Sequence, residues 1–369
     1  MRSSSAVAYL DPLISSGSRP NLFVLINTVV TKLLQSGVSS GLPEFKTVEL
    51  GQTNSSSRVQ VSATKEVVLS GGVIGTPHIL MLSGIGSKGT LSSFGIKTIV
   101  DLPSVGQNLT DHPLVQNHFL VNSTQTFDDV LRNETLAQQT FIEWNTTRQG
   151  LFANPSGGTL GFLRLPSNSS ILSEFGDPSS GPHSSHIELI FVNAFGPVGA
   201  PVPPNGHFVT IITAVVSPLS RGFMTLASSD PFDKPLLNPN YLSSDFDVLT
   251  MVQAIKDMQT FMSTGPWKDF VIGPIGALAN STTDEQLQFY ARNTSESISH
   301  SIGTARMSPF GADWGVVNPD LSVKGTHGLS VVDASIFPSI PECHTQAPTY
   351  IVAERAVDFI TARNGLCTC

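Results

Sequence analysis

The stretch GGVIGTPHILMLSGIG, residues 71–86, follows a short apolar run at residues 67–69. The run is typical of a buried strand, and the two glycines after it are typical of a turn. Thr76 is a residue type that caps helix N-termini, and Pro77 suits the first helical position. The pattern therefore predicts a helix over residues 78–83 that the next glycine ends. A strand, a glycine turn and a helix in this order are typical of a nucleotide-binding α/β domain.

A literal GxGxxG, formed by Gly84, Gly86 and Gly89, overlaps the end of this stretch. A phosphate loop has to lie between a strand and a helix N-terminus, where backbone N–H groups face the phosphate. Here the glycines follow the predicted helix. We therefore interpret them as a C-terminal loop.

Further strands are expected before residue 112 and after residue 180. Between them, residues 112–180 show no clear hydrophobic pattern. Two helices are also expected, the first with a capping box formed by Ser244 and Asp247 and the second starting at Pro348. The expected strands are residues 22–26 (buried), 29–34, 58–61, 65–69, 187–192, 208–216 and 222–226, and the expected helices are residues 245–264 and 348–362. Glycine- and proline-rich turns between the strands after residue 186 predict an antiparallel sheet.

Composition narrows the function classes. The chain has 369 residues, 40% of them hydrophobic and 13% charged, which is enough for two globular domains. Its net charge of −8 argues against nucleic-acid and membrane-surface partners, and no apolar run reaches the roughly 18 residues of a membrane span. Three cysteines are too few for a disulfide scaffold. The sequence has no closely spaced Cys/His set that would predict a metal site and no GxSxG motif that would predict a serine hydrolase.

Several further motifs occur in a fixed order along the chain. They are DLP (101–103), VGQNL (105–109), DH (111–112), SHSIGTARM (299–307), VVNPDL (316–321), LSVVDASIF (329–337) and CHTQAPT (343–349). Together with residues 71–86 they resemble the signatures of the glucose–methanol–choline (GMC) oxidoreductase family. The His-Thr-Gln at residues 344–346 resembles the fungal aryl-alcohol oxidases most closely.

The resemblance implies an α/β fold in which part of a doubly wound FAD-binding domain joins an α+β substrate domain built on an antiparallel sheet. It assigns residues 1–111 and 300–369 to the FAD-binding domain and residues 112–299 to the substrate domain. It also implies that this chain begins where a relative is more than a third complete, so that the N-terminal βαβ unit for the ADP part of FAD is missing.

The resemblance also assigns site residues. It implies that His300 accepts the proton of the substrate hydroxyl and that His344 hydrogen-bonds the same oxygen. A neutral imidazole is a natural proton acceptor at mild pH, so the residue types suit this chemistry. The start of the last helix would stabilise negative charge on a reduced flavin. The cofactor-binding residues implied are Val30, Asp333, Ala334, Thr345 and Gln346.

The function implied is a FAD-dependent oxidoreductase acting on CH–OH groups. It would oxidise a primary alcohol, with aryl alcohols as candidates, to an aldehyde by proton abstraction and hydride transfer to flavin N5, and pass the electrons to oxygen or a quinone. Ser299 and Val73 depart from the relatives' pattern, where an aromatic and a small residue stand. Because the N-terminal βαβ unit is missing, we expect the chain as given to bind FAD weakly or not at all. The alternative to the oxidoreductase is a truncated or degenerate remnant that does not bind FAD.

Glycosylation sequons bear on location. They begin at Asn54, Asn108, Asn122, Asn133, Asn145, Asn168, Asn280 and Asn293. Their number favours a secreted glycoprotein as the full-length parent.

Overall fold

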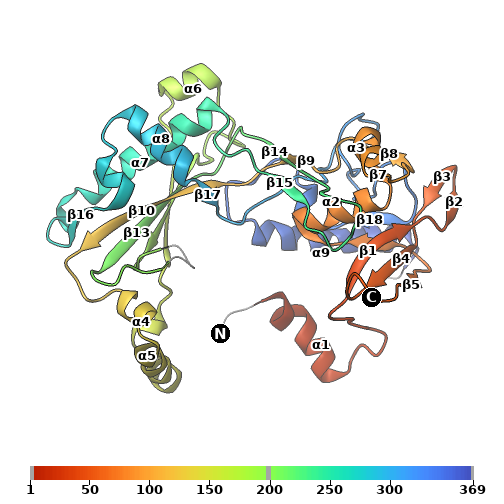
Figure 1. The fold of residues 1–369 in the computed structure, drawn as a ribbon, viewed down its shortest axis with the longest axis horizontal. Coiled ribbons are helices and arrows are strands. Elements are labelled where there is room, and N and C mark those ends of the chain that lie inside the picture. Colours follow the sequence, from red (N-terminus) through yellow and green to blue (C-terminus); the bar gives the residue numbers. More distant parts are fainter. Residues whose placement is uncertain (1–3, 197–200, 367–369) are drawn as a thin grey trace.

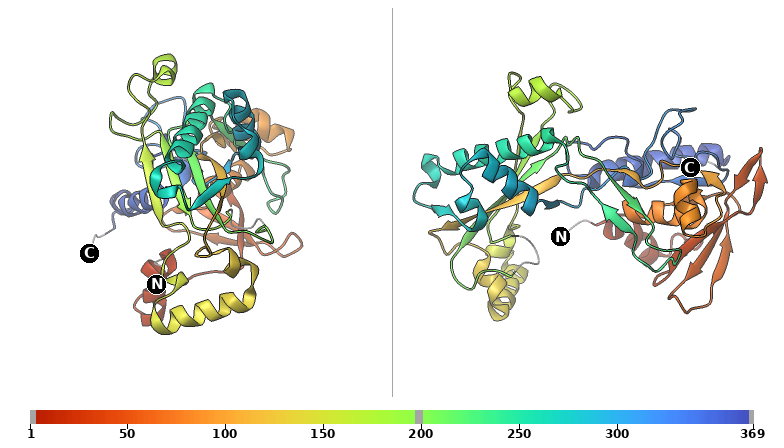
Figure 2. Two further views of the ribbon diagram at one scale, coloured as in Figure 1. Left: turned by 90° about the vertical axis from the view of Figure 1, so that its left-hand side faces the viewer. Right: turned by 45° about the horizontal axis from the view of Figure 1, so that its top comes forward.

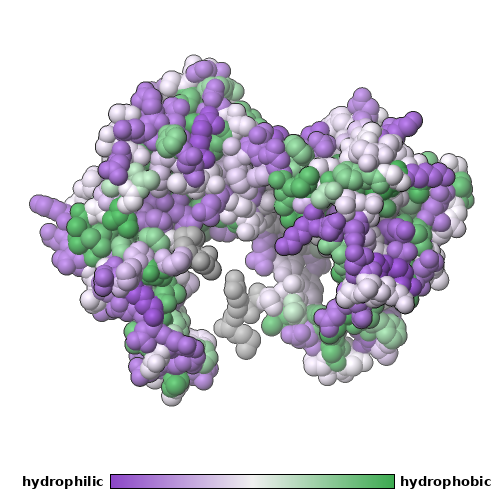
Figure 3. Space-filling view, viewed as in Figure 1, coloured by the Kyte–Doolittle hydropathy of each residue, from purple (hydrophilic) through white to green (hydrophobic). Residues whose placement is uncertain are grey.

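The computed structural model describes residues 4–196 and 201–366. Two lobes lie side by side, and each surrounds its own cluster of buried apolar side chains (Figure 1). In the space-filling view the lobes are joined along one side and stand apart on the other (Figure 3).

The first lobe contains both the start and the end of the chain. Its sheets are small: β1-β4-β5 is antiparallel, β6 and β18 pair in parallel, and the two-stranded sheets β2-β3 and β7-β8 complete the lobe. The helix α2 packs between β1 and the short helix η5. The elements are η1 (Ala6–Leu10), α1 (Asp11–Ser16), β1 (Val29–Leu34), β2 (Gly37–Ser39), β3 (Leu42–Glu44), β4 (Thr47–Gly51), β5 (Val59–Ser62), β6 (Val67–Leu69), α2 (Gly72–Leu82), β7 (Ile85–Gly86), α3 (Lys88–Ser93), β8 (Val100–Asp101), β18 (Leu329–Val331), η5 (Ala334–Ile336) and α9 (Gln346–Arg363).

The second lobe is built on a six-stranded antiparallel sheet in the order β11-β12-β13-β10-β16, with β17 paired to β10. The helices α7 and α8 cover one face of this sheet (Figure 2). The elements are β10 (Pro113–Val121), α4 (Asp128–Arg132), α5 (Glu134–Thr147), η2 (Leu151–Ala153), β11 (Thr159–Leu163), α6 (Ser170–Phe175), β12 (Ile187–Val192), β13 (Phe208–Val215), α7 (Asp245–Met262), η3 (Gly265–Trp267), β16 (Val271–Pro274), η4 (Gly276–Asn280), α8 (Asp284–Thr294) and β17 (Glu296–Ser297).

The sheet is two-sided because side chains alternate along each strand. On β12, Ile187 and Leu189 belong to the core under α7, so Glu188 faces the other way. On β10, Val115 and Phe119 belong to the same core, so Gln116 points to the same side as Glu188. This second face, turned away from α7, carries the polar side chains that matter below.

A third sheet links the lobes. The strands β9 (Gln107–Leu109), β14 (Gly222–Thr225) and β15 (Leu236–Asn238) pair in the order β15-β14-β9, and Met224 is fully buried in the core of the first lobe. The middle of the chain therefore contributes a hairpin to the first lobe.

The mixed fold with an antiparallel sheet, predicted from the sequence, is confirmed. The strands expected near residues 29–34, 58–61, 65–69, 187–192, 208–216 and 222–226 are present within a residue or two. Gly84 follows α2 with a φ of 80°, as expected for a C-terminal loop. The long strand β10 lies where the sequence pattern was indistinct.

The predicted start of α2 is wrong. The helix begins at Gly72, so Pro77 lies inside it and cannot donate to the carbonyl of Val73. The hydroxyl of Thr304 donates to that carbonyl instead, at 2.7 Å. Thr76 does not cap the helix, because its hydroxyl donates to the Asp333 carboxylate at 2.6 Å. A side chain from a remote segment thus makes an internal proline tolerable.

Three other local predictions are also wrong. Residues 22–26 form no strand and are exposed, Phe23 by 87%, because no described strand pairs with them. Ser244 precedes α7 without a side-chain cap, since the Asp247 carboxylate accepts from the backbone N–H groups of Leu219 and Ser220. The last helix starts at Gln346, ahead of Pro348.

One glycine provides a test of the packing between β9 and β14. Gly106 has a φ of 80°, and a Cβ there would lie 2.3 Å from the Met224 carbonyl oxygen. We expect Gly106→Ala to destabilise the fold by roughly 2–4 kcal/mol, from left-handed strain and overpacking together. Thermal unfolding of the purified variant measures this. Gly89→Ala is the matched control, since a Cβ at Gly89 meets nothing within 4 Å; equal stability of the two variants would contradict the packing argument.

Candidate active site

The structure brings His300 and His344 together. Their ring centroids lie 4.6 Å apart with an angle of 65° between the planes. His300 follows β17 at the end of the loop that leaves the second lobe, whereas His344 immediately precedes the cap of α9 in the first lobe. His300 is buried, and the side chain of His344 is 46% exposed. The pair therefore lies where elements of both lobes meet, with one ring open to its surroundings.

A glutamate from the sheet holds His344. The Nε2 atom of His344 lies 2.8 Å from Oε1 of Glu188, which is fully buried on β12. Burial raises the pKa of Glu188, and the hydrogen bond to His344 opposes that rise. Its second oxygen, Oε2, has no hydrogen-bond partner among the described residues. The sequence held a signal that we missed: one acidic residue within the apolar strand Ile187–Val192.

A second histidine and an aspartate hold His300. The Nδ1 atoms of His112 and His300 lie 3.0 Å apart, and the Asp111 carboxylate accepts from the His300 backbone N–H at 3.0 Å. Burial lowers the pKa of His300 to about 4, with a further lowering by His344 and an opposing effect of Asp111. His300 is therefore neutral across the mild pH range, as a proton acceptor has to be.

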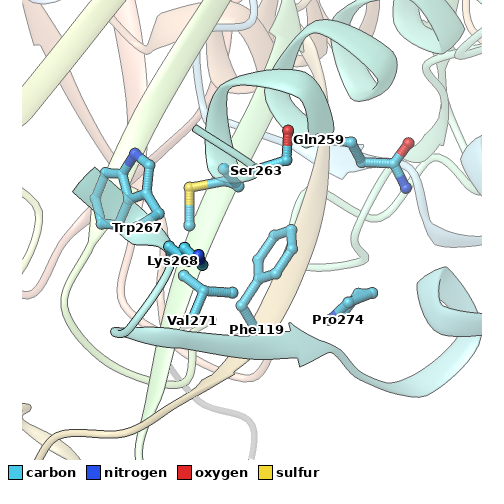
Figure 4. Close-up of a pocket in the computed structure, with 8 residues that line it drawn as sticks. Phe119, Gln259, Ser263, Trp267, Lys268, Val271 and Pro274 are labelled. Atoms are coloured by element: carbon cyan, nitrogen blue, oxygen red, sulfur yellow. The ribbon is translucent and has the colours of Figure 1, made fainter. Parts of the chain in front are cut away.

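A cavity of about 850 Å³ opens beside this group on the sheet face turned away from α7. It reaches the loop residues Ser297 to Ser299 that lead into His300. Its lining combines apolar side chains, including Leu114, Ile212 and Phe195, with polar ones, including Gln116 and Glu296. A mostly apolar cavity with a few polar groups is typical of a small-molecule site. A smaller cavity, of about 330 Å³, lies near Phe119 and Trp267 at the far end of the second lobe, and none of the predicted site residues lines it (Figure 4).

The start of α9 supplies donors next to His344. Thr345 is the N-cap and makes no side-chain cap hydrogen bond. Gln346 and Ala347 are exposed, and their N–H groups lie in the first turn, where no intrahelical partner exists. Such a helix start favours a negatively charged ligand group. This donor set has the chemistry to hold the anionic edge of a reduced flavin, which is the role that the family resemblance implies for Thr345 and Gln346.

The other expected cofactor residues have different surroundings. Asp333 links α2 to η5: its carboxylate accepts from Gly72 N at 2.9 Å and from Ser335 N at 2.8 Å, as well as from Thr76. The Ala334 carbonyl accepts from the N–H of Gly303. Both residues thus lie against α2 and the GTARM segment. Val30 lies on β1, in the separate sheet β1-β4-β5.

Family models match the chain at both ends. The N-terminal GMC oxidoreductase model matches residues 1–114, and the C-terminal GMC oxidoreductase model matches residues 218–353. Both segments contain the motifs described above.

The chain belongs to the GMC oxidoreductase family.

Curated relatives agree with this assignment. The chain is 40% identical over 354 residues to the dehydrogenase eriK of Hericium erinaceus, which covers 93% of this chain and 57% of that protein. It is 38% identical over 366 residues to a pyranose dehydrogenase of Agaricus campestris, covering 96% of this chain and 58% of that protein. The chain thus spans less than three-fifths of the length of these two relatives.

Solved structures share the fold. A formate oxidase of Aspergillus oryzae, studied for its FAD modification, has a TM-score of 0.84 and 32% identity, covering 94% of this chain and 62% of that one. A fungal aryl-alcohol oxidase has a TM-score of 0.79 and 25% identity, covering 98% and 64%. Within residues 4–196 and 201–366, no helix combines the length and apolar character needed to cross a membrane.

The surroundings of His300 predict its titration. We expect its imidazole to titrate near pH 4, because burial disfavours the charged ring. His344→Gln should raise this pKa, since the electrostatic interaction with His344 contributes to its lowering. An NMR titration of the histidine rings measures both values. His327→Gln is the control, because His327 pairs with Glu44 in the first lobe and should leave His300 unchanged; a His300 pKa near 6.5 would contradict the burial argument.

Proposed function

We propose that this chain carries the catalytic histidines and substrate cavity of a FAD-dependent oxidoreductase that acts on CH–OH groups. The observation that carries the proposal is the His300–His344 ring pair, with ring centroids 4.6 Å apart, beside the start of α9. The loop residues Ser297 to Ser299, which lead into His300, line the cavity of about 850 Å³, although neither histidine does. FAD, when bound, supplies the hydride acceptor. The residues of this chain bind and orient the alcohol and remove its proton.

His300 is the proton acceptor in this proposal. Its backbone is fixed by Asp111, its Nδ1 is engaged by His112, and its Nε2 remains for the hydroxyl of the substrate. Its low pKa keeps the ring neutral at mild pH, so a lone pair is present before the alcohol arrives. A neutral ring of low basicity accepts the proton fully only as the hydride leaves the carbon, which couples the two transfers.

His344 orients the substrate oxygen. His344 has to carry a proton on Nδ1 in order to donate to that oxygen. The hydrogen bond between its Nε2 and Glu188 then needs a second proton, carried by either partner. The pair must therefore hold two protons, and the raised pKa of buried Glu188 favours their retention. Glu188 thus acts as a positioning residue that keeps His344 a donor.

The substrate proposed is a primary alcohol, with aryl alcohols as candidates, and the electron acceptor is oxygen or a quinone. Leu114, Ile212 and Phe195 give the cavity an apolar lining that suits a ring. Gln116 and Glu296 place polar groups in the same cavity, which suits a substrate with further hydroxyl groups. Screening aryl alcohols against pyranoses, with oxygen or benzoquinone as acceptor, distinguishes these choices.

The visible spectrum tests the proposal directly. If the 369-residue protein, incubated with FAD and desalted, shows flavin absorbance that a substrate alcohol bleaches without oxygen, the proposal is supported and the expectation of weak FAD binding is wrong. A colourless product would favour the alternative of a remnant that does not bind FAD.

Substitution of the histidines should separate their roles. In the flavin-loaded enzyme, His300→Ala should lower turnover by roughly 10²–10⁴-fold, the usual range for loss of a general base. His344→Ala should also lower turnover, because the alcohol loses a fixed orientation. Stopped-flow reduction of the flavin measures both. His327→Ala is the control, and wild-type reduction rates in both active-site variants would exclude the assignment.

The pH profile should follow from the same groups. Asp111, His112 and His344 are the ionisable groups around His300, and His300 has a pKa of about 4. Flavin reduction should therefore be lost as the pH falls through about 4, where the imidazole becomes protonated, and should keep a plateau above that for as long as the His344–Glu188 pair holds its two protons. A half-maximal rate near pH 6.5 or higher on the acid limb would contradict this.

We also propose that the protein is a secreted glycoprotein. Seven of the eight sequon asparagines are exposed, the exception being Asn108, which is partly buried on β9 and whose side-chain nitrogen Nδ2 is buried. Mass spectrometry of the protein secreted by a fungal host should detect glycans at exposed sequons and none at Asn108.

A further inference from the structure

The DH motif, Asp111-His112, lies between β9 and β10 and contacts His300. Both side chains are buried, His112 completely. A buried carboxylate and a buried imidazole are costly unless they are hydrogen-bonded. Most of their partners lie in the loop that carries His300.

Asp111 gathers five donors onto one carboxylate. Its Oδ1 accepts from the backbone N–H groups of His112 at 2.8 Å and of His300 at 3.0 Å. Its Oδ2 accepts from the hydroxyls of Tyr241 at 2.9 Å, Ser301 at 2.8 Å and Ser297. These contacts lie on both sides of Ser299, a non-glycine residue with a φ of 65°. The carboxylate thus holds the loop in a conformation that is unfavourable by itself.

His112 constrains the ring of His300. Its Nδ1 lies 3.0 Å from the Nδ1 of His300, and the two rings are nearly perpendicular, at 87°. Two neutral imidazoles can share only one proton along this line. One ring must therefore donate through Nδ1 and the other must accept, which makes the two tautomers interdependent.

The proposed role of His300 decides which ring donates. A neutral His300 can offer a lone pair at Nε2 only if its single ring proton is on Nδ1. The Nε2 of His112 is buried and has no hydrogen-bond partner among the described residues, so the contact with His300 is the one that its ring makes through a nitrogen. His112 then accepts at Nδ1, and His300 donates from its own Nδ1. Burial, together with His300, lowers the pKa of His112 to about 3, so it stays neutral and able to accept.

We propose that Asp111 and His112 are a positioning pair for His300: Asp111 fixes its backbone, and His112 fixes its neutral ring as the Nδ1–H tautomer, with Nε2 unprotonated. This inference rests on the proposed function for its catalytic meaning. The Nε2 lone pair is the atom that accepts the alcohol proton. When it does so, the Nδ1–H···Nδ1 bond to His112 persists and strengthens, because a charged donor makes the stronger bond. No ring rotation is needed between the two protonation states.

The test is the tautomer itself, read from ring-nitrogen NMR of the ¹⁵N-histidine-labelled 369-residue protein at neutral pH. Wild-type His300 should show a protonated Nδ1 and an unprotonated Nε2. His112→Asn places an amide oxygen near the former Nδ1 and should preserve this pattern. His112→Phe keeps the ring volume but removes the acceptor, so His300 should shift toward the Nε2–H tautomer that free imidazoles prefer.

A wild-type His300 protonated at Nε2 would overturn the proposal, and this result does not depend on whether the variants fold. An unchanged Nδ1–H tautomer of His300 in a folded His112→Phe variant would also overturn it. In the flavin-loaded enzyme, His112→Phe should lower kcat by about 10–100-fold with little change in KM, as is typical of groups that orient a reactive imidazole, and His112→Asn should recover most of the loss. Absence of alcohol oxidation in the wild type would refute the proposed function while leaving the tautomer result standing.

Discussion

The antiparallel pairing of residues 106–112 with residues 298–305 is the interaction on which the rest of the structure depends. The backbone pairs Gly106 N with Thr304 O at 2.8 Å, and Thr110 with Ile302 in both directions at 3.1 and 2.8 Å. This seam runs along the junction of the lobes: β14 pairs with β9 on one side, and β10 continues from it into the large sheet. Because Asp111, His112 and His300 all lie on the seam, its backbone hydrogen bonds bring the three residues together, and the side chains of Asp111 and His112 then fix the backbone and ring of His300.

The seam tolerates little substitution because it is closely packed. A Cβ on Gly303 would lie 2.6 Å from the Asn108 carbonyl oxygen, and the φ of Gly303 is 91°. The next residue, Thr304, completes α2 by donating to Val73, the carbonyl that Pro77 leaves without a helical partner. Gly303, Thr304 and Pro77, which come from two distant motifs, therefore belong to the same local arrangement of the seam and α2. Their residue types follow from close approach and hydrogen bonding, without a direct role in chemistry.

The features of the fold and site that could be predicted from the sequence are those decided by residues close together in the chain. Strands with strong apolar patterns, such as Ile187–Val192, were predicted correctly because burial on a sheet face decides them locally. The start of α2 and the cap of α7 were wrong because remote partners, Thr304 for one and the Leu219–Ser220 backbone for the other, compete with local capping. His300 and His344 were identified by family resemblance. Glu188 and His112 were missed because their importance arises only where strands distant in sequence meet.

The rings of His300 and His344 contact opposite kinds of partner, and this asymmetry suits the role proposed for each. As the proposed base, His300 has to be uncharged at rest, and it is buried against another neutral imidazole that can share only one proton with it. As the proposed donor, His344 has to keep its proton, and it hydrogen-bonds a carboxylate that can hold an extra proton. If Glu188 lay against His300, that ring would be charged where a base is needed. If His112 lay against His344, that ring would be an acceptor where a donor is needed. The fold avoids this because His112 comes from the seam and Glu188 from the sheet face, so each support reaches only the ring nearest to it.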